Sequence, residues 1–350
     1  MSFKTNDVVF LIGAGCSYNA SIPTANKMVE DIENALLPKD KKWQDFRELY
    51  CYIKSSILYG DGIFGNFNNA FNIEKFVNVL SELEKKERNV VYPFIANWNN
   101  RLIDLAGKDF ENLKKLKELI TEQLIAWITP YGYQQKAQYY KGFYNFQREV
   151  ELPLRIFSLN YDLCFEDVKP HDFNLELGFD ESMVWNYLRF EDNPQADVGI
   201  YLYKLHGSVT WLREEKTNIL KKAEHPPKNP DLIFGTYTKL QSTDPYLFYV
   251  YELRKYSLES KLIVVIGYSY GDSYVNNLLK QALEHDKTRK LISVAIDEAE
   301  NGKDAISRKL LLDDNNQIEF IPATAKEFLE ISLTLETLAK YLPARQTDIF

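Results

Sequence analysis

Cysteine is scarce in this sequence. Three cysteines occur in 350 residues, Cys16, Cys51 and Cys164, and no two of them form a Cys-x-x-Cys pair. Zinc knuckles and the disulfide frameworks of secreted proteins need closely spaced or paired cysteines. The sequence therefore predicts no metal site and no disulfide framework, and we expect a cytoplasmic protein.

Long apolar runs and an excess of positive charge are also lacking. No apolar stretch approaches the roughly 20 residues that cross a bilayer. The formal net charge is -8, whereas the recognition of nucleic-acid phosphates needs a basic surface. We therefore expect neither a membrane protein nor direct, sequence-specific binding to nucleic acid.

Apolar residues are plentiful, at 45% of the chain with 14% aromatic residues, which is typical of a compact globular protein. Short apolar runs that predict strands lie at residues 8–12, 154–159, 200–205, 232–234, 262–266, 291–296 and 318–321. Several of these runs alternate with helical patterns such as residues 275–284, and this alternation predicts a parallel α/β sheet.

The stretch between the first two strands has a different pattern. Residues 73–148 show helical periodicity without a strand pattern, and residues 56–71, rich in Gly, Asn and Phe, predict a loop. We expect a discontinuous α/β domain over residues 1–70 and 150–325. An all-helical insertion would occupy residues 71–149, and a C-terminal helical tail residues 326–350.

The first apolar run ends in a glycine turn, Gly13-Ala14-Gly15-Cys16-Ser17. Such a turn can be an ordinary tight turn, or it can hold a pyrophosphate at the start of a helix. A dehydrogenase fingerprint is disfavoured, because its third glycine would fall at Tyr18 and no acidic residue ends a second strand about 20 residues later.

Polar residues follow the other predicted strands. Asn160 and Asp162 follow one strand and His206 the next, at the end of the strand where open α/β sheets bind ligands. Asn and Asp also favour turns and helix caps. A lone histidine is often structural, but its side chain is the one best suited to proton transfer near neutral pH.

Two later loops have the same form. The loop from Gly267 to Asp272 is either a turn in which Asp272 or Ser273 caps a helix, or a second loop in contact with a nucleotide. Asp297 follows the next strand and either accepts hydrogen bonds from a ribose diol or caps the following turn, and we favour the cap.

Together these four segments resemble the sirtuin family. Its opening Gly-Ala-Gly-x-Ser…Ile-Pro is similar to Gly13, Ala14, Gly15, Ser17, Ile22 and Pro23. Its Gln-Asn-Ile-Asp turn is similar to Leu159-Asn160-Tyr161-Asp162, its Leu-His-Gly to Leu205-His206-Gly207, and its Gly-x-Ser to Gly267 and Ser269. The resemblance implies a sirtuin-like Rossmann fold over residues 5–70 and 150–322.

The chain departs from the protein deacylases of that family. Thr24-Ala25-Asn26 stands where the deacylases have Asp-Phe-Arg. No cysteine occurs between the His206 and Gly267 motifs, where the deacylases carry a zinc ribbon. The chain instead resembles sirtuin-like NAD-hydrolysing effectors of bacterial antiphage systems, above all the effector that assembles with a HerA-type hexameric ATPase.

This resemblance implies an enzyme that cleaves the nicotinamide–ribose bond of NAD to nicotinamide and ADP-ribose and so depletes NAD in antiphage defence. NAD is then the substrate, no metal is needed, and a regulatory partner such as the ATPase and a homo-oligomer are expected. The alternatives are an NAD-dependent protein deacylase and a non-catalytic sensor of NAD or ADP-ribose.

The resemblance also implies roles for single residues. Amides around Gly13, Ala14 and Gly15, with Ser17, would hold the pyrophosphate, and Pro23 is a further implied contact with NAD. Asn160 would hold the nicotinamide ribose or the attacking water, Asp162 the carboxamide, and His206 would accept a proton. Gly267 and Ser269 would close on the phosphate and adenosine side, and Asp297 is a further candidate contact, with a ribose diol.

Overall fold

The computed structural model describes residues 3–65, 71–84, 100–191, 197–233 and 243–342. The chain forms two compact units. The sheet unit comprises Met1–Ile22, Thr129–Leu232 and Leu240–Phe350, and the helical unit comprises Pro23–Ile128 and Ile233–Lys239.

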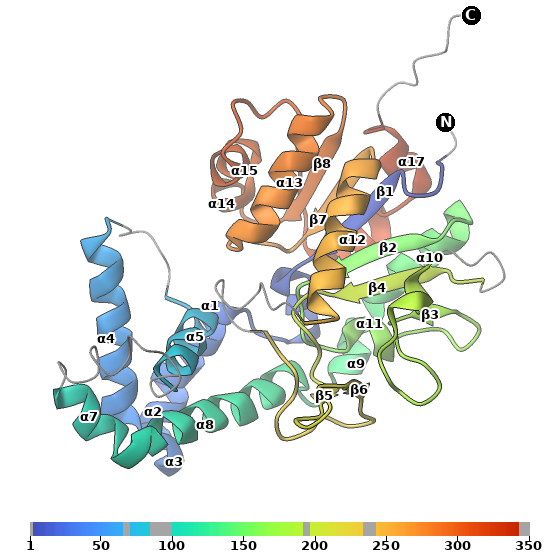
Figure 1. Ribbon diagram of the computed structural model, residues 1–350. Coiled ribbons are helices and arrows are strands. Elements are labelled where there is room, and N and C mark those ends of the chain that lie inside the picture. Colours follow the sequence, from blue (N-terminus) through green and yellow to red (C-terminus); the bar gives the residue numbers. More distant parts are fainter. Residues whose placement is uncertain (1–2, 66–70, 85–99, 192–196, 234–242, 343–350) are drawn as a thin grey trace, which may run out of the picture. The chain divides into compact units, whose positions relative to one another are not determined.

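The sheet unit is built on a seven-stranded sheet with the order β3-β4-β2-β1-β7-β8-β9 (Figure 1). Every pair of neighbouring strands in it is parallel. The strands are β1 (Val8–Ile12), β2 (Leu154–Ser158), β3 (Leu175–Glu176), β4 (Ile200–Lys204), β7 (Leu262–Ile266), β8 (Lys290–Ala295) and β9 (Ile318–Pro322). The predicted parallel α/β sheet is confirmed.

Helices cover both faces of the sheet, which explains why β1 and β7 at its centre are apolar throughout. On one face the ring of Phe10 in β1 meets Phe143 and Phe146 of α10 (Lys141–Val150) edge to face. On the other face Tyr203 of β4 packs on Tyr249 of α12 (Tyr246–Glu259). Every residue of β1, β2, β4 and β7 is buried as a result.

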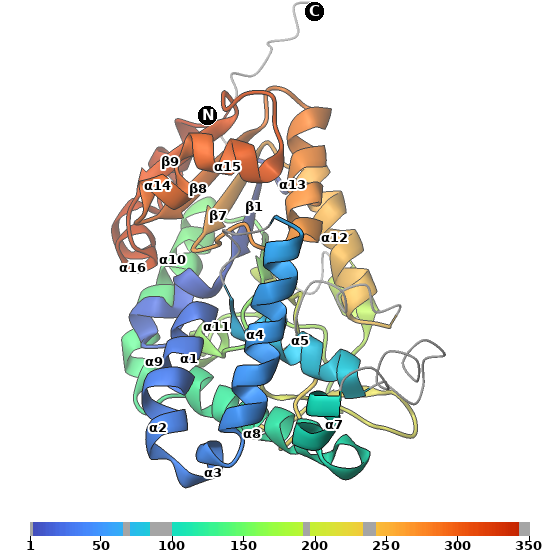
Figure 2. The same cartoon turned by 90° about the vertical axis from the view of Figure 1, so that its left-hand side faces the viewer.

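The remaining helices of this unit are short, apart from α13. They are the 3₁₀ helix Ala14–Ala20, α9 (Tyr133–Lys136), the 3₁₀ helix Ala137–Tyr140, α11 (Cys164–Asp167), the 3₁₀ helix Tyr187–Phe190, α13 (Ser273–His285), α14 (Glu298–Asn301), α15 (Lys303–Leu310), α16 (Ala325–Glu327), the π-helix Phe328–Ser332 and α17 (Leu335–Ala339). Helix α13 lies beside α12 in both ribbon views (Figures 1 and 2).

The order of the strands creates a switch point between β1 and β7. From β1 the chain builds outward through β2 to β4 and β3, and it then returns to place β7 on the opposite side of β1. Open α/β sheets bind ligands outside the carboxyl ends of the strands at such a point. The loops that follow β1, β2, β4 and β7 are therefore the natural position for a site.

All the regular secondary structure in the described part of the helical unit is helical (Figure 2). They are α1 (Ala25–Asp31), the π-helix Ile32–Leu36, α2 (Leu37–Lys39), α3 (Lys41–Gln44), α4 (Arg47–Ile63), α5 (Ile73–Glu84), α7 (Asn100–Ala106), the 3₁₀ helix Lys108–Phe110 and α8 (Glu111–Ile128). Across the described ranges of both units, no helix is long and apolar enough for a bilayer crossing.

Three sequence-based expectations need correction or addition. The loop predicted at residues 56–71 is wrong for residues 56–63, because α4 continues through them and buries Ile57 together with Leu49 and Ile53; residues 66–70 lie outside the described ranges. The strand expected at 232–234 is only an isolated bridge at Leu232, and residue 234 is outside the described ranges. The short strand β3 and the hairpin of β5 (Trp211–Arg213) and β6 (Leu220–Lys222) were not expected.

Candidate functional site

The sheet register brings the motif loops to one edge. Ile12 at the end of β1 lies opposite Ser158 of β2 and Ile266 of β7, and Ser158 lies opposite Lys204 of β4. The loops that begin directly after these residues carry Gly13, Asn160, His206 and Gly267. Four segments that are distant in sequence therefore meet at the carboxyl edge of the sheet, around the switch point.

The glycines after β1 and β7 interlock. A Cβ atom added to Gly13 or Gly15 would lie 2.8 or 2.9 Å from backbone atoms of Gly267 or its neighbour. A Cβ atom on Gly267, whose φ is +64°, would lie 2.2 Å from the amide nitrogen of Cys16. The three glycines are required because two backbones are in direct contact here.

The same contact uses some of the backbone donors of the turn. The amide of Gly13 donates to the carbonyl of Ile266 at 3.0 Å, and the amide of Gly15 donates to that of Gly267 at 2.8 Å. The amide of Cys16 donates back to the carbonyl of Gly13 at 2.8 Å. A pyrophosphate-binding role for this turn remains a prediction, and in this conformation these three amides already have acceptors within the protein.

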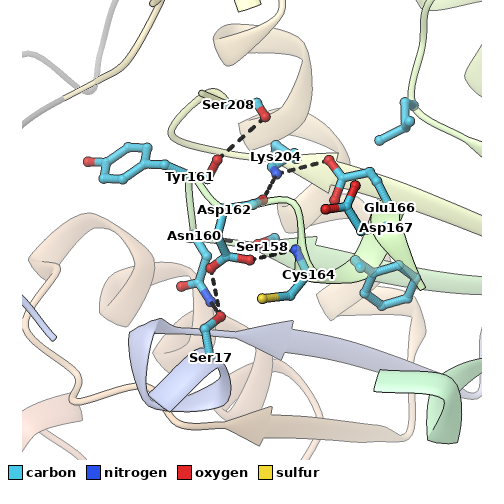
Figure 3. Close-up of polar contacts among 12 residues, drawn as sticks. Ser17, Ser158, Asn160, Tyr161, Asp162, Cys164, Glu166, Asp167, Lys204 and Ser208 are labelled. Atoms are coloured by element: carbon cyan, nitrogen blue, oxygen red, sulfur yellow. Dashed lines mark hydrogen bonds and ion pairs between the residues drawn. The ribbon is translucent and has the colours of Figure 1, made fainter. Parts of the chain in front are cut away.

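Ser17, Asn160 and Asp162 form a buried hydrogen-bond network (Figure 3). The Ser17 hydroxyl donates to Asp162 Oδ2 at 2.6 Å, and Asn160 Nδ2 donates to Ser17 Oγ at 2.9 Å. Asn160 Nδ2 also donates to the carbonyl of Gly13 at 2.9 Å. Asp162 Oδ1 accepts from the amide of Cys164 at 3.0 Å.

These contacts fix which way the amide of Asn160 faces. A backbone carbonyl can only accept a hydrogen bond, so the group that faces Gly13 must be the NH₂ of Asn160. Both of its hydrogens are then used, on Gly13 and Ser17. Oδ1 receives no hydrogen bond from the described residues, and in Figure 3 it points away from Ser17. Asn160 therefore offers a fixed acceptor at this edge.

His206 is held on both sides of its buried ring. Nδ1 lies 3.1 Å from the carbonyl of Leu159, so Nδ1 carries a proton and donates it to that oxygen. Nε2 lies 3.6 Å from Oδ2 of Asp272, which is also buried. The other carboxylate oxygen of Asp272 accepts from the amides of Tyr274 and Val275, so Asp272 rather than Ser273 caps α13. Contact of this loop with a nucleotide remains a prediction.

A buried lysine ties two of the loops together. Lys204, the last residue of β4, donates from Nζ to the carbonyl of Asp162 and forms an ion pair of 3.0 Å with Glu166 (Figure 3). Its side chain is only 2% exposed. The end of β4, where His206 follows, is therefore fixed to the turn that carries Asn160 and Asp162.

Three contributors were missed by the sequence analysis. Lys204 had a signal, because it is a charged residue inside an apolar run that predicts a buried strand. Asp272 was treated only as a cap. Tyr140, whose hydroxyl lies 2.8 Å from Ser17 Oγ, had no signal beyond its place in an aromatic helical stretch.

The side chains of four predicted ligand contacts form no hydrogen bond with this network in the described part of the chain. Ala14 and Ser269 are exposed, and the carbonyl of Ser269 accepts from Lys309. Asp297 is exposed and caps α14 through the amides of Ala299 and Glu300, as favoured. Pro23 is the first residue of the helical unit. The ligand-binding roles given to these residues remain predictions.

The described parts of the chain contain no group of three or more His, Cys, Asp or Glu side chains that could hold a metal ion. Two of the three cysteines, Cys16 and Cys164, are buried beside this network. Burial raises the pKa of the Cys16 thiol to about 12 and raises the pKa of Cys164 as well. Both therefore remain protonated at neutral pH and are poor nucleophiles.

The fold and the edge loops define a parallel α/β protein of Rossmann type with a polar cluster at its switch point. Residues 154–321, from β2 to β9, match the family model of the SIR2-like domain. That range contains Asn160, Asp162, His206, Gly267 and Ser269. The turn after β1 precedes it and joins the same sheet through the pairing of β1 with β2 and β7.

Solved structures of Sir2 proteins are similar to this chain. A complex of a Sir2 homologue with NAD has 15% identity and a TM-score of 0.45 over 95% of this chain and 90% of its own. A mutant Sir2 homologue with 2′-O-acetyl-ADP-ribose has 14% identity and a TM-score of 0.45 over 95% and 92%. No match was found among curated proteins.

Proposed function

We propose that this protein is an NAD glycohydrolase. The observation that supports the proposal is that one edge of a parallel sheet, around its switch point, carries both a fixed amide acceptor on Asn160 and a buried His206–Asp272 pair. The match of residues 154–321 to the SIR2-like domain supports NAD as the ligand class.

The reaction breaks the bond between C1′ of the ribose and the pyridinium nitrogen, and the electron pair of that bond neutralises the nicotinamide. The oxygen of water bonds to C1′, and one proton is released. An enzyme must orient the ribose and the water and stabilise positive charge that develops on the ribose. Asn160 Oδ1 would accept a hydrogen bond from a ribose hydroxyl or from the water.

His206 would accept the proton. Because Nδ1 already donates to Leu159, Nε2 is the nitrogen that can take up a proton from water or a ribose hydroxyl. Asp272 Oδ2, 3.6 Å away, would stabilise the imidazolium that results. General-base assistance of this kind contributes typically about 10²- to 10⁴-fold to the rate.

Asp162 differs from Asn160 and His206 in how its acceptor atoms are used. Both of its carboxylate oxygens accept hydrogen bonds from the protein, one from Ser17 and one from the amide of Cys164. Any contact of Asp162 with the carboxamide of NAD would use the remaining lone pairs of these oxygens. The described contacts support a role in which its negative charge stabilises the site and orients Ser17.

The wider biological setting is part of the proposal. The motif resemblance supports depletion of NAD in bacterial antiphage defence, in the cytoplasm, by a homo-oligomer that a HerA-type hexameric ATPase regulates. The absence of cysteine from the sequence between His206 and Gly267 disfavours a deacylase with a zinc ribbon. A non-catalytic sensor would not need His206, Asp272 and Asn160 together.

Incubation of the purified chain with NAD alone, and with a HerA-type ATPase added, tests the proposal by chromatography of nicotinamide and ADP-ribose. We expect stoichiometric formation of both products, and a loss of at least about 10²-fold in both Asn160→Ala and His206→Ala. His171→Ala, at an exposed histidine, is the matched control and should keep full activity.

Three results would contradict the proposal. Nicotinamide release that requires an acyl-lysine peptide would identify a deacylase. Calorimetric binding of NAD without any product, in the presence and absence of the ATPase, would identify a sensor. Full activity in His206→Ala would remove the histidine from the mechanism.

A further inference from the structure

Two adjacent tyrosines reach into the turn after β1. Tyr139 and Tyr140 end the 3₁₀ helix Ala137–Tyr140 and are 2% and 1% exposed. The hydroxyl of Tyr139 donates to the carbonyl of Cys16 at 2.6 Å, and that of Tyr140 lies 2.8 Å from Ser17 Oγ. Residues 123 positions apart in sequence are therefore in direct contact at the site.

The direction of the Tyr140–Ser17 hydrogen bond follows from the other contacts of Ser17. A serine hydroxyl has one hydrogen, and Ser17 gives it to Asp162, whose carboxylate can only accept. Tyr140 must therefore be the donor. Burial raises the pKa of Tyr140 well above its ordinary value, so the phenol keeps its proton throughout the neutral range.

Ser17 Oγ is then fully used. It donates once, to Asp162, and accepts twice, from Tyr140 and from Asn160 Nδ2. With Ser17 only 1% exposed, its hydroxyl has no remaining site for a phosphate oxygen. Its contacts instead orient the amide of Asn160, whose Oδ1 is the atom left for a ligand.

We propose that Tyr140 is a positioning residue that acts on Asn160 through Ser17, and that Ser17 is itself a positioning residue rather than a ligand for the pyrophosphate. The inference rests on the proposed function in one respect, namely that Asn160 contacts the substrate. The two hydrogen bonds, from Tyr140 to Ser17 and from Ser17 to Asp162, do not depend on the proposed function.

Tyr140→Phe isolates the hydroxyl. The ring packs against Phe143 and Phe165, with centroids 6.1 and 5.9 Å away, and phenylalanine can keep these contacts. Tyr144→Phe is the matched control. Tyr144 lies on α10, is equally buried, and loses a hydroxyl that donates to the carbonyl of Phe165, without contact with Ser17.

Steady-state cleavage of NAD by four proteins, the wild type, Tyr140→Phe, Ser17→Ala and the double variant, measures the coupling. We expect kcat to fall about tenfold in Tyr140→Phe, the factor for one lost buried hydrogen bond, with a smaller change in KM. In the Ser17→Ala background the second change should have little further effect, because Tyr140 acts through Ser17. Independent, multiplicative losses would overturn the proposal.

A second measurement does not depend on activity. The side-chain amide protons of Asn160, identified in ¹⁵N spectra by their loss in Asn160→Asp, should exchange slowly with solvent in the wild type and faster in Tyr140→Phe. Tyr144→Phe should leave them unchanged. Unchanged exchange of these protons in Tyr140→Phe would overturn the positioning role. If the wild type does not cleave NAD but the exchange changes as expected, only the proposed function is overturned.

Discussion

Replacement of Gly267 by alanine tests whether the contact between the β1 and β7 loops holds the site edge together. The added Cβ atom would lie 2.2 Å from the nitrogen of Cys16 and 2.4 Å from the carbonyl carbon of Gly15, both backbone atoms that cannot rotate away. The residue also has φ of +64°. The left-handed conformation costs a residue with a Cβ roughly 1–2 kcal/mol, and the forced separation of a packed contact costs about 1–3 kcal/mol.

We therefore expect Gly267→Ala to lower the free energy of unfolding by about 2–5 kcal/mol, measured by urea denaturation followed by circular dichroism. NAD cleavage should fall as well, since the separated loops carry the turn to which Asn160 is hydrogen-bonded. Gly271→Ala is the control, because only Ser269 Oγ, 3.5 Å away, would lie near its Cβ atom. It should change stability by less than about 0.5 kcal/mol. Equal stability of the two variants would refute the steric argument.

Two further predictions concern buried groups near the site. Lys204→Met should lower the free energy of unfolding by about 3–5 kcal/mol, because it leaves the largely buried Glu166 without its partner. Lys221→Met, at a half-exposed surface pair with Glu214, should have a much smaller effect in the same urea titration, because solvent screens that pair. Titration of the native protein with a thiol reagent at pH 8 should modify the exposed Cys51 alone, because Cys16 and Cys164 are buried and their raised pKa values keep them as thiols. Three reactive thiols before denaturation would contradict the described burial.

The parts of the fold that could be predicted from the sequence are those set by local pattern. The runs that became β1 and β7 are apolar throughout, since both faces of a parallel sheet are covered. Those that became β2 and β4 are apolar apart from Arg155, Ser158 and Lys204. The residues directly after them were recognisable as candidates because ligands bind at that end of the strands. The prediction of a loop over residues 56–63 was wrong because it gave more weight to Gly60 and Gly62 than to the helical spacing of Leu49, Ile53 and Ile57.

The contacts between these loops could not be predicted in the same way. From the sequence, Gly13 and Gly15 were assigned to a tight turn or to a bound pyrophosphate. In the structure both positions need glycine because the backbone at Gly267 lies directly against them. Nothing in the sequence near Tyr140 indicates that its hydroxyl meets Ser17. Such facts depend on which distant segments the topology brings together, and neither composition nor periodicity contains that information.

Many polar groups at this edge of the sheet already have hydrogen-bond partners within the protein. Ser17 Oγ, Asn160 Nδ2 and the amides of Gly13 and Gly15 all have protein partners. A site in this state does not have to reorganise when substrate arrives, and preorganised groups stabilise a transition state at no further cost. Two of these hydrogen bonds hold the amide of Asn160 directly, on Gly13 and on Ser17. Under the proposed function, Oδ1 of Asn160 would therefore meet the substrate already oriented, and loss of either contact should lower the rate of NAD cleavage.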